Sequence, residues 1–341
     1  MQTFFQLIRW KNLTYMLLTL CLLQWGMVNP ILAYNGFPPV LTPLQLTLFV
    51  VALVCITAAG YCINDYFDTK IDAINHPNTR IVGRLIERRT AMLYHQLLTA
   101  VGVACGIILA VWLRSWMIGI LFVFMPGMLW FYSSSYKRQF VVGNIIVALH
   151  AGLCVVMLAM TNAAAYNHAY AAIIEHIVEN GHDAAFVNTQ AQRPIVLIYA
   201  WLGAVALLLT LLVLIREVVK DCEDINGDRE LECHTIPVKW GFKGAKAVVV
   251  SLAAVTIALV AWTVLGLIEM PDNGLTVKYM LVGVCVPLLV LCYLMLTAKT
   301  RADYKGVRSV VQFVMMVVSA YPLLFYYVIA KSADNVTFFG L

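Results

Sequence analysis

Six aspartates in this sequence form two triplets with the same internal spacing. In each triplet they occupy positions i, i+3 and i+7, which lie on one face of a helix. The triplets are Asp65, Asp68 and Asp72, and Asp221, Asp224 and Asp228. Each lies at the end of a long apolar run, where an uncompensated carboxylate is costly and needs a partner. Because six carboxylates around one space would repel one another, the pattern predicts that all six bind metal ions and take part in catalysis.

The chemistry predicted for these aspartates is the binding of a diphosphate through Mg²⁺. Mg²⁺ takes oxygen ligands and is usually bound by one or two carboxylates, with phosphate oxygens and water as its other ligands. Basic residues near the triplets can bind the remaining phosphate oxygens: these are Arg80, Arg84, Lys137, Arg138, Arg216 and Lys220. An apolar tunnel behind such a site suits an isoprenyl diphosphate, because stabilising the leaving diphosphate lets the allylic carbon–oxygen bond ionise.

Aromatic residues lie next to the first aspartate triplet and to Lys137 in the sequence. An allylic cation must be kept away from bulk water, and aromatic faces can stabilise it by cation–π contact. The candidates for this role are Tyr66, Phe67, Phe131, Tyr132 and Tyr136.

The composition is that of a polytopic membrane protein. Of the 341 residues, 62% are hydrophobic and 12% are charged, whereas an average soluble domain is roughly 25% charged. Nine apolar runs are long enough to span a membrane, so we expect a single all-α transmembrane domain. The runs cover residues 14–33, 43–63, 91–113, 116–134, 140–161, 195–215, 245–268, 276–298 and 309–330.

The basic residues predict the orientation in the membrane. With the N-terminus in the cytoplasm, all but four of the 23 Lys and Arg residues lie on the cytoplasmic side, as the positive-inside rule requires. Both triplets then lie on that side, where their matching offsets indicate a pseudo-repeat of facing helix–loop units. We therefore expect an integral protein of the cell (inner) membrane, with a cytoplasmic mouth to its site. The longest segment on the other side, Asn162–Pro194, is expected to be a solvated loop with a short surface helix.

Several segments resemble those of the UbiA superfamily of intramembrane prenyltransferases. Asn64 and the first triplet are similar to the family's first signature, and the stretch from Arg216 to Asp228 is similar to its second. Tyr132–Arg138 resembles the family's Tyr-Ser…Lys segment, and Leu7–Leu13 resembles its first helix. These matches occur in the expected order over nearly the whole chain.

The resemblance implies nine transmembrane helices around a central cavity, with two Mg²⁺ between the acidic motifs. It also implies transfer of a prenyl group from an isoprenyl diphosphate to a lipophilic acceptor. Substrate-binding roles are implied for residues of the matched segments: Arg9, Asn12, Asn64, Tyr132, Lys137, Arg216 and Lys220. The expected partners are the donor, the acceptor and the lipid bilayer, with no nucleic acid.

Within the family, the second motif is most similar to that of digeranylgeranylglyceryl phosphate synthases, which join a second prenyl chain to a prenylglyceryl phosphate. This chain departs from the family after the first motif, where the family often has Asn-x-Pro-x-Arg-Pro. Here Arg80 is displaced by one position and no proline follows it. The sequence therefore leaves open whether Arg80 or Arg84 contacts the diphosphate.

Other functions remain open at this point. An aromatic (quinone-precursor) prenyltransferase would use the same donor site. An ion-coupled transporter also places acids in a membrane, but near its midplane, whereas the acids here are in loops or at the ends of runs. His150 and Asn144, inside the fifth run, are explained more simply as helix–helix hydrogen-bonding residues than as a base.

Overall fold

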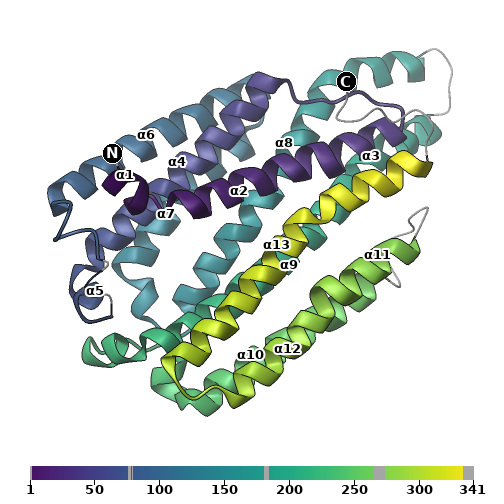
Figure 1. Cartoon of the computed structure of the whole chain (residues 1–341). Coiled ribbons are helices and arrows are strands. Elements are labelled where there is room, and N and C mark those ends of the chain that lie inside the picture. Colours follow the sequence, from purple (N-terminus) through teal and green to yellow (C-terminus); the bar gives the residue numbers. More distant parts are fainter. Residues whose placement is uncertain (1, 76–77, 79, 180–183, 265–272, 333–341) are drawn as a thin grey trace.

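The computed structural model describes residues 2–75, 78, 80–179, 184–264 and 273–332. Throughout these ranges the chain forms helices and turns, with no β-strand. Nine helices of the described chain are long and apolar enough to cross a membrane, which confirms the predicted number of spans. They run roughly side by side as one elongated bundle (Figure 1).

The helical elements follow one another with short connections. The α-helices are α1 (Gln2–Leu7), α2 (Trp10–Leu23), α3 (Asn29–Tyr34), α4 (Pro43–Phe67), α5 (Thr69–Asn75), α6 (Arg88–Trp112), α7 (Trp116–Ser134), α8 (Val142–Glu179), α9 (Ala184–Glu230), α10 (Ile236–Trp262), α11 (Asn273–Met280), α12 (Val286–Thr297) and α13 (Arg301–Ser332). Two π-helical segments, η1 (Gln24–Val28) and η4 (Leu281–Cys285), and the 3₁₀ segment η2 (Tyr136–Arg138) join some of them.

The ends of the spans differ from the expected ones where polar residues continue a helix. The sixth span runs over Ala191–Glu230 instead of residues 195–215, so the second triplet lies within α9 and not in a loop after it. Hydropathy ends the apolar run at residue 215, but backbone hydrogen bonding continues for four more turns. The end of the predicted seventh span, residues 265–268, lies outside the described residues.

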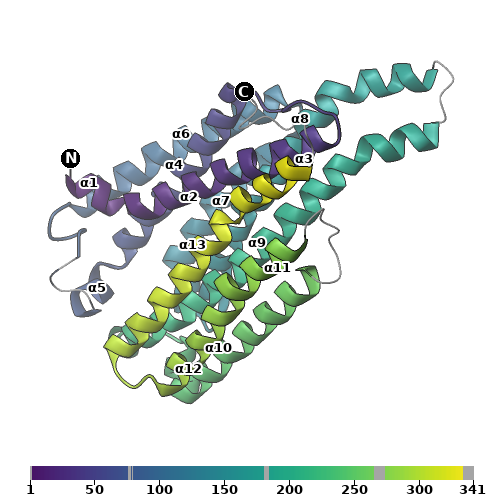
Figure 2. The ribbon, with the colours of Figure 1, turned by 45° about the vertical axis from the view of Figure 1, so that its right-hand side comes forward.

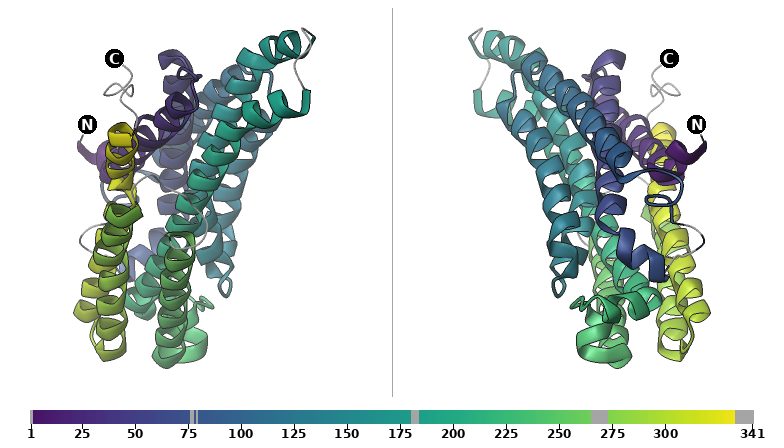
Figure 3. Two further views of the ribbon diagram at one scale, coloured as in Figure 1. Left: turned by 90° about the vertical axis from the view of Figure 1, so that its right-hand side faces the viewer. Right: turned by 90° about the vertical axis from the view of Figure 1, so that its left-hand side faces the viewer.

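The prediction of a loop with a short surface helix over Asn162–Pro194 is wrong. α8 continues to Glu179 and α9 begins at Ala184, and both extend beyond the other helices at the end of the bundle opposite α5 (Figures 2 and 3). The two helices pack against one another. Tyr166 on α8 is fully buried, and its hydroxyl donates to the Ala191 carbonyl of α9 at 2.8 Å. Packing between neighbouring helices therefore stabilises helical structure in a segment whose composition alone predicts a solvated loop.

α9 is the helix around which the rest is arranged. It packs against α8, α10 and α13, and α4 packs against α6 and α7. Large apolar side chains on the outer helices remain exposed, including Val111 on α6 and Trp116 on α7. Such contiguous apolar faces are expected where a helix bundle meets lipid.

The segments that carry the two triplets meet at one end of the bundle. α5, which carries Asp72 of the first triplet, packs against α9, which carries the second triplet. Close by, the His234 amide donates to the Arg138 carbonyl at 2.9 Å and joins the α9–α10 connection to the α7–α8 connection. These contacts bring segments distant in the sequence together around one space.

Candidate active site

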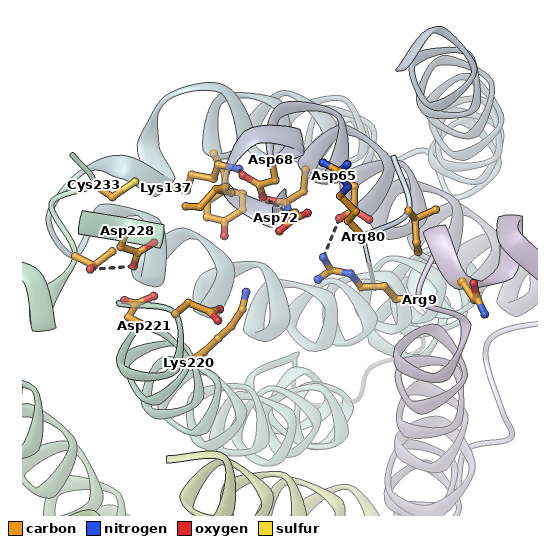
Figure 4. A pocket seen from close by; sticks show the side chains of 17 residues that line it. Arg9, Asp65, Asp68, Asp72, Arg80, Lys137, Lys220, Asp221, Asp228 and Cys233 are labelled. Carbon is orange, nitrogen blue, oxygen red and sulfur yellow. Dashed lines mark hydrogen bonds and ion pairs between the residues drawn. The ribbon is translucent and has the colours of Figure 1, made fainter. Parts of the chain in front are cut away.

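All six aspartates line one cavity of about 350 Å³, which we call the aspartate chamber. Asp65, Asp68 and Asp72 lie on one side of it, and Asp221 and Asp228 lie on the other (Figure 4). The walls come from α4, α5 and α9, with contributions from the α1–α2 junction, α7 and the α9–α10 connection.

The first triplet lies at a break between two helices. α4 ends at Phe67, Asp68 occupies the position between the helices, and α5 carries Asp72. Arg9, from the α1–α2 junction, donates to Asp65 Oδ1 at 2.9 Å, and Lys137 from η2 forms an ion pair with Asp68 Oδ1. Two carboxylates of this triplet are thus bound by cations from other helices.

The first triplet also has a donor on its own helix. Asn64, one turn before Asp68 on α4, donates from its side chain to Asp68 Oδ2 at 2.8 Å. Both oxygens of Asp68 therefore have partners, Lys137 on one and Asn64 on the other. This fixes the orientation of the carboxylate toward the chamber.

The second triplet lies on the uninterrupted helix α9 and is bound mainly by neutral donors. Asn144 of α8 donates to Asp221 Oδ2 at 2.8 Å, and Thr235 donates to Asp228 Oδ2 at 3.1 Å. Asp224 pairs with Arg301 of α13 at 3.3 Å, and the Arg301 side chain is 55% exposed.

A second cavity of about 200 Å³ adjoins the aspartate chamber, and we call it the inner chamber. The two share Arg9, Asn64, Tyr132 and Lys220 as lining residues. The rest of the inner chamber is formed by polar and apolar side chains of α2, α4, α7, α8, α9 and α13: Asn12, Thr57, Gly60, Tyr61, Leu129, Val147, His150, Arg216, Glu217, Arg308 and Gln312. Together the chambers fall within the roughly 300–1,000 Å³ of typical ligand sites.

All seven substrate-binding candidates line one of these two chambers. Lys137 lines the aspartate chamber, Asn12 and Arg216 line the inner chamber, and the four shared residues line both. Arg216 is bound to the neighbouring Glu217, with Nη2 at 2.5 Å from Oε1.

The two arginines left open by the sequence lie in different places. Arg80 lines the aspartate chamber, and its Nε is buried without a hydrogen-bond partner among the described residues. Arg84 is exposed and donates to the Asn78 carbonyl. Arg80 is therefore the one of the two that is placed to reach a ligand in the chamber.

Four of the five aromatic candidates for stabilising an allylic cation do not line either chamber. Only Tyr132 of that set lines either chamber. Tyr66 lies under the Arg88 guanidinium, Phe67 packs edge-on against Trp130, and Phe131 and Tyr136 are exposed. Since neighbours on a helix point in different directions, proximity in sequence to Asp68 does not place a ring in the cavity.

Sequence reasoning did not single out several residues that line the chambers. Gln6 and Thr235 line the aspartate chamber, and Glu217 and Arg308 line the inner chamber. Nothing in their local sequence marks Gln6 or Thr235, whereas Glu217 could have been suspected as a charge at the end of an apolar run.

Two polar residues of α8 were expected to join helices. The donation from Asn144 of α8 to Asp221 of α9 confirms the interpretation of Asn144 as a helix–helix hydrogen-bonding residue. The hydrogen bond between His150 Nε2 and Thr57 Oγ1, 3.1 Å long, confirms the interpretation of His150 as a helix–helix hydrogen-bonding residue.

Cys233 also lines the aspartate chamber and is buried. Burial raises the pKa of its thiol above the ordinary value, and the nearby charge of Asp228 raises it further. The side chain is thus a neutral thiol at pH 7, and the chemistry of the chamber depends on oxygen and nitrogen groups.

The donor set of the aspartate chamber fits Mg²⁺. Six carboxylates supply the oxygen ligands that this ion prefers. Among the described residues, no three acidic, His or Cys side chains come together as a metal cage. Mg²⁺ usually takes only one or two protein carboxylates and completes its coordination with water and phosphate oxygens.

Comparison with known proteins identifies relatives that are named digeranylgeranylglyceryl phosphate synthases. The chain is 31% identical over 203 residues to the digeranylgeranylglyceryl phosphate synthase of Methanosphaera stadtmanae, covering 60% of each protein. It is 33% identical over 200 residues to the synthase of Natronomonas pharaonis, covering 59% of this chain and 58% of that protein. The alignments thus span about three fifths of the curated relatives.

Solved structures share the fold along nearly the whole chain. A structure described as giving insights into digeranylgeranylglyceryl phosphate synthase in membranes matches 97% of this chain and 98% of its own, with a TM-score of 0.55 and 20% identity. A UbiA homologue from Archaeoglobus fulgidus bound to GPP and Mg²⁺ matches 96% and 99%, with a TM-score of 0.54 and 15% identity. The model of the UbiA prenyltransferase family matches residues 24–317. This chain belongs to the UbiA prenyltransferase family.

Proposed function

We propose that this protein transfers a prenyl group from an isoprenyl diphosphate to a lipophilic acceptor, and that the acceptor is a prenylglyceryl phosphate. The observation that carries the proposal is the convergence of six aspartates and several cations on one chamber. The name of the curated relatives supports this acceptor, and the GPP and Mg²⁺ bound to the A. fulgidus homologue support this donor.

In this proposal the two triplets bind the head group of the donor from opposite sides. The aspartates would hold Mg²⁺, which when bound supplies the positive charge that stabilises a departing diphosphate. Lys137, Arg80 and Lys220 line the same chamber and can donate to phosphate oxygens that carry no metal. These donors favour the charge-separated state over the intact substrate, which is the requirement for catalysis.

The transfer itself exchanges one carbon–oxygen bond for another. The bond between the allylic carbon and the diphosphate breaks with its electron pair on the diphosphate, and the acceptor oxygen bonds to that carbon as its proton is released. Tyr132 lines both chambers, so its ring can face the allylic carbon between donor and acceptor. The surrounding helices exclude the bulk water that would compete as a nucleophile.

The location of the chamber also belongs to the proposal. We place its mouth on the cytoplasmic side of the cell membrane, because the basic residues of the chain are concentrated at that end. The whole chain would act as one transmembrane domain, since both triplets contribute to a single cavity.

A panel of acceptors tests the function directly. Purified protein is incubated with labelled geranylgeranyl diphosphate and geranylgeranylglyceryl phosphate, 4-hydroxybenzoate, dihydroxynaphthoate or haem. We expect label in the glyceryl phosphate product, none in excess chelator, and recovery when Mg²⁺ is restored. Transfer to 4-hydroxybenzoate or dihydroxynaphthoate alone would replace our proposal by the aromatic alternative. The absence of Mg²⁺-dependent diphosphate release with every acceptor would refute both.

A further inference from the structure

The inner chamber lies deeper in the bundle than the aspartates. On α9 its residues Arg216 and Glu217 precede the second triplet, and on α4 its residues Gly60 and Tyr61 precede Asp65. At 1.5 Å per residue, Glu217 lies about 10 Å further along α9 than Asp224. Charged groups at such depth are rare in membrane proteins and mark ligand or ion sites by default.

The lining of this chamber is predominantly cationic. It contains Arg9, Arg216, Lys220 and Arg308, with Glu217 as its one carboxylate. The carboxylates outside the lining that pair with these cations are Asp65, bound by Arg9, and Glu223, next to Arg308. When Asp65 and Glu223 are counted with Glu217, the four cations still outnumber these three carboxylates.

Two of these cations have incomplete hydrogen bonding. Arg308 Nε forms an ion pair with Glu223 Oε1 at 3.0 Å, but among the described residues that buried oxygen accepts no hydrogen bond. Lys220 Nζ is 3.9 Å from Glu217 Oε2, beyond hydrogen-bond distance, while the other oxygen of Glu217 is bound by Arg216. An added anion would therefore find donors that the protein's own acids do not saturate.

We propose that the inner chamber binds the anionic head group of the acceptor, a phosphate ester, through Arg216, Lys220 and Arg308. This inference rests on the proposed function and adds to it the place and the charge of the acceptor. Because the two chambers share Lys220 and Tyr132, an acceptor bound in one lies next to a donor bound in the other. A neutral acceptor would leave these partly exposed cations with only Glu217 and Glu223 as anionic partners, and would bind less tightly.

Arg308 is the residue with which to test this subsite independently of the donor site, because it lines the inner chamber and does not line the aspartate chamber. The binding of two probes is measured without Mg²⁺ and without donor: geranylgeranylglyceryl phosphate and the corresponding alcohol, geranylgeranylglycerol. We expect the wild-type protein to bind the phosphate at least about tenfold more tightly than the alcohol. Arg308→Gln should weaken phosphate binding by about tenfold or more, since a charge-assisted hydrogen bond is lost, and leave alcohol binding unchanged.

Two further variants make the result interpretable. Lys305→Gln removes a charge from an exposed position one turn before Arg308 on α13, and should leave both affinities unchanged. Arg308→Lys keeps the charge and should recover part of the preference for the phosphate, which a purely structural role of the arginine does not predict. Elution as a single species in size-exclusion chromatography checks that each variant is folded.

Three outcomes would overturn the inference. Equal wild-type affinity for the phosphate and the alcohol would mean that the cations only balance buried acids. Equal losses of both affinities in Arg308→Gln would assign the arginine to packing. A raised KM for geranylgeranyl diphosphate with unchanged acceptor binding would mean that the chamber serves the donor. In each case Mg²⁺-dependent release of diphosphate from the donor would persist, so the proposed function would still stand.

Discussion

The two aspartate triplets have identical spacing but different surroundings. The first lies across a helix break, and cations from the α1–α2 junction and η2 bind Asp65 and Asp68. The second lies on the continuous helix α9, and the amide of Asn144 and the hydroxyl of Thr235 bind Asp221 and Asp228. Asp224 pairs with a cation, Arg301 of α13.

This difference indicates a division of labour within one chamber. Two of the three charges of the first triplet are balanced by protein cations, whereas neutral donors orient Asp221 and Asp228 without cancelling their charge. The second triplet therefore has more uncompensated charge with which to attract a divalent ion. In the proposed function, the first triplet would bring donors such as Lys137 within reach of a diphosphate in the chamber.

The largest effect should follow from removing a carboxylate of either triplet. We expect Asp68→Ala and Asp224→Ala each to lower Mg²⁺-dependent transfer by at least about 100-fold, because each removes a charge that the transition state requires. Initial rates at saturating donor and acceptor measure this, with thermal unfolding as a check of stability. Normal turnover in one of the two variants would show that a single triplet suffices.

An intermediate effect should follow from replacing the cation of the first triplet. Lys137→Gln removes a charge-assisted hydrogen bond worth about 1.5–3 kcal/mol, so kcat/KM for the donor should fall by roughly 10- to 150-fold. The same measurement over a series of Mg²⁺ concentrations distinguishes a Lys137 that contacts the diphosphate from a Lys137 that only balances the charge of Asp68. If excess Mg²⁺ restores the rate fully, Lys137 only balances Asp68 and does not contact the diphosphate.

The smallest effects should come from the neutral donors of the second triplet. Asn144→Ala and Thr235→Val each remove an uncharged partner worth about 0.5–1.5 kcal/mol, which corresponds to roughly a 2- to 12-fold loss of kcat/KM. Because the carboxylate charge is retained, the loss should appear mainly as a higher Mg²⁺ requirement. A loss as large as that of Lys137→Gln would contradict the division of labour between the triplets.

Much of the fold could be predicted because the signal is local. Each span is a run of apolar residues of sufficient length, and nine such runs give nine helices in the described chain. Hydropathy does not predict the helix ends where polar segments are also helical. Examples are residues 216–230, which continue α9, and the extension of α8 to Glu179. There the helix depends on contacts with neighbouring helices that hydropathy does not record.

The site was predictable to the same extent. Spacing and charge identified the six aspartates and most of the cations that line the chambers. Spacing could not distinguish Tyr132, which lines both chambers, from Phe131 and Tyr136, which are exposed. Phe131 and Tyr132 are neighbours on α7 and therefore point in different directions, and which of them faces the cavity depends on the rotation of α7 in the bundle. Tyr136 lies beyond the end of α7, in η2.

The sequence by itself determined that the protein spans a membrane and carries two matched sets of carboxylates, because run length and residue spacing are properties of a local segment. Only the tertiary structure decided which donors reach which aspartates and that a cationic chamber lies behind them. Those pairings depend on how closely and at what rotation helices pack, as where Gly102 of α6 lies against Ala52 and Ile56 of α4, or Gly152 of α8 against Ala206 and Thr210 of α9. A shift of a few ångströms at such contacts would separate the two triplets without altering either one.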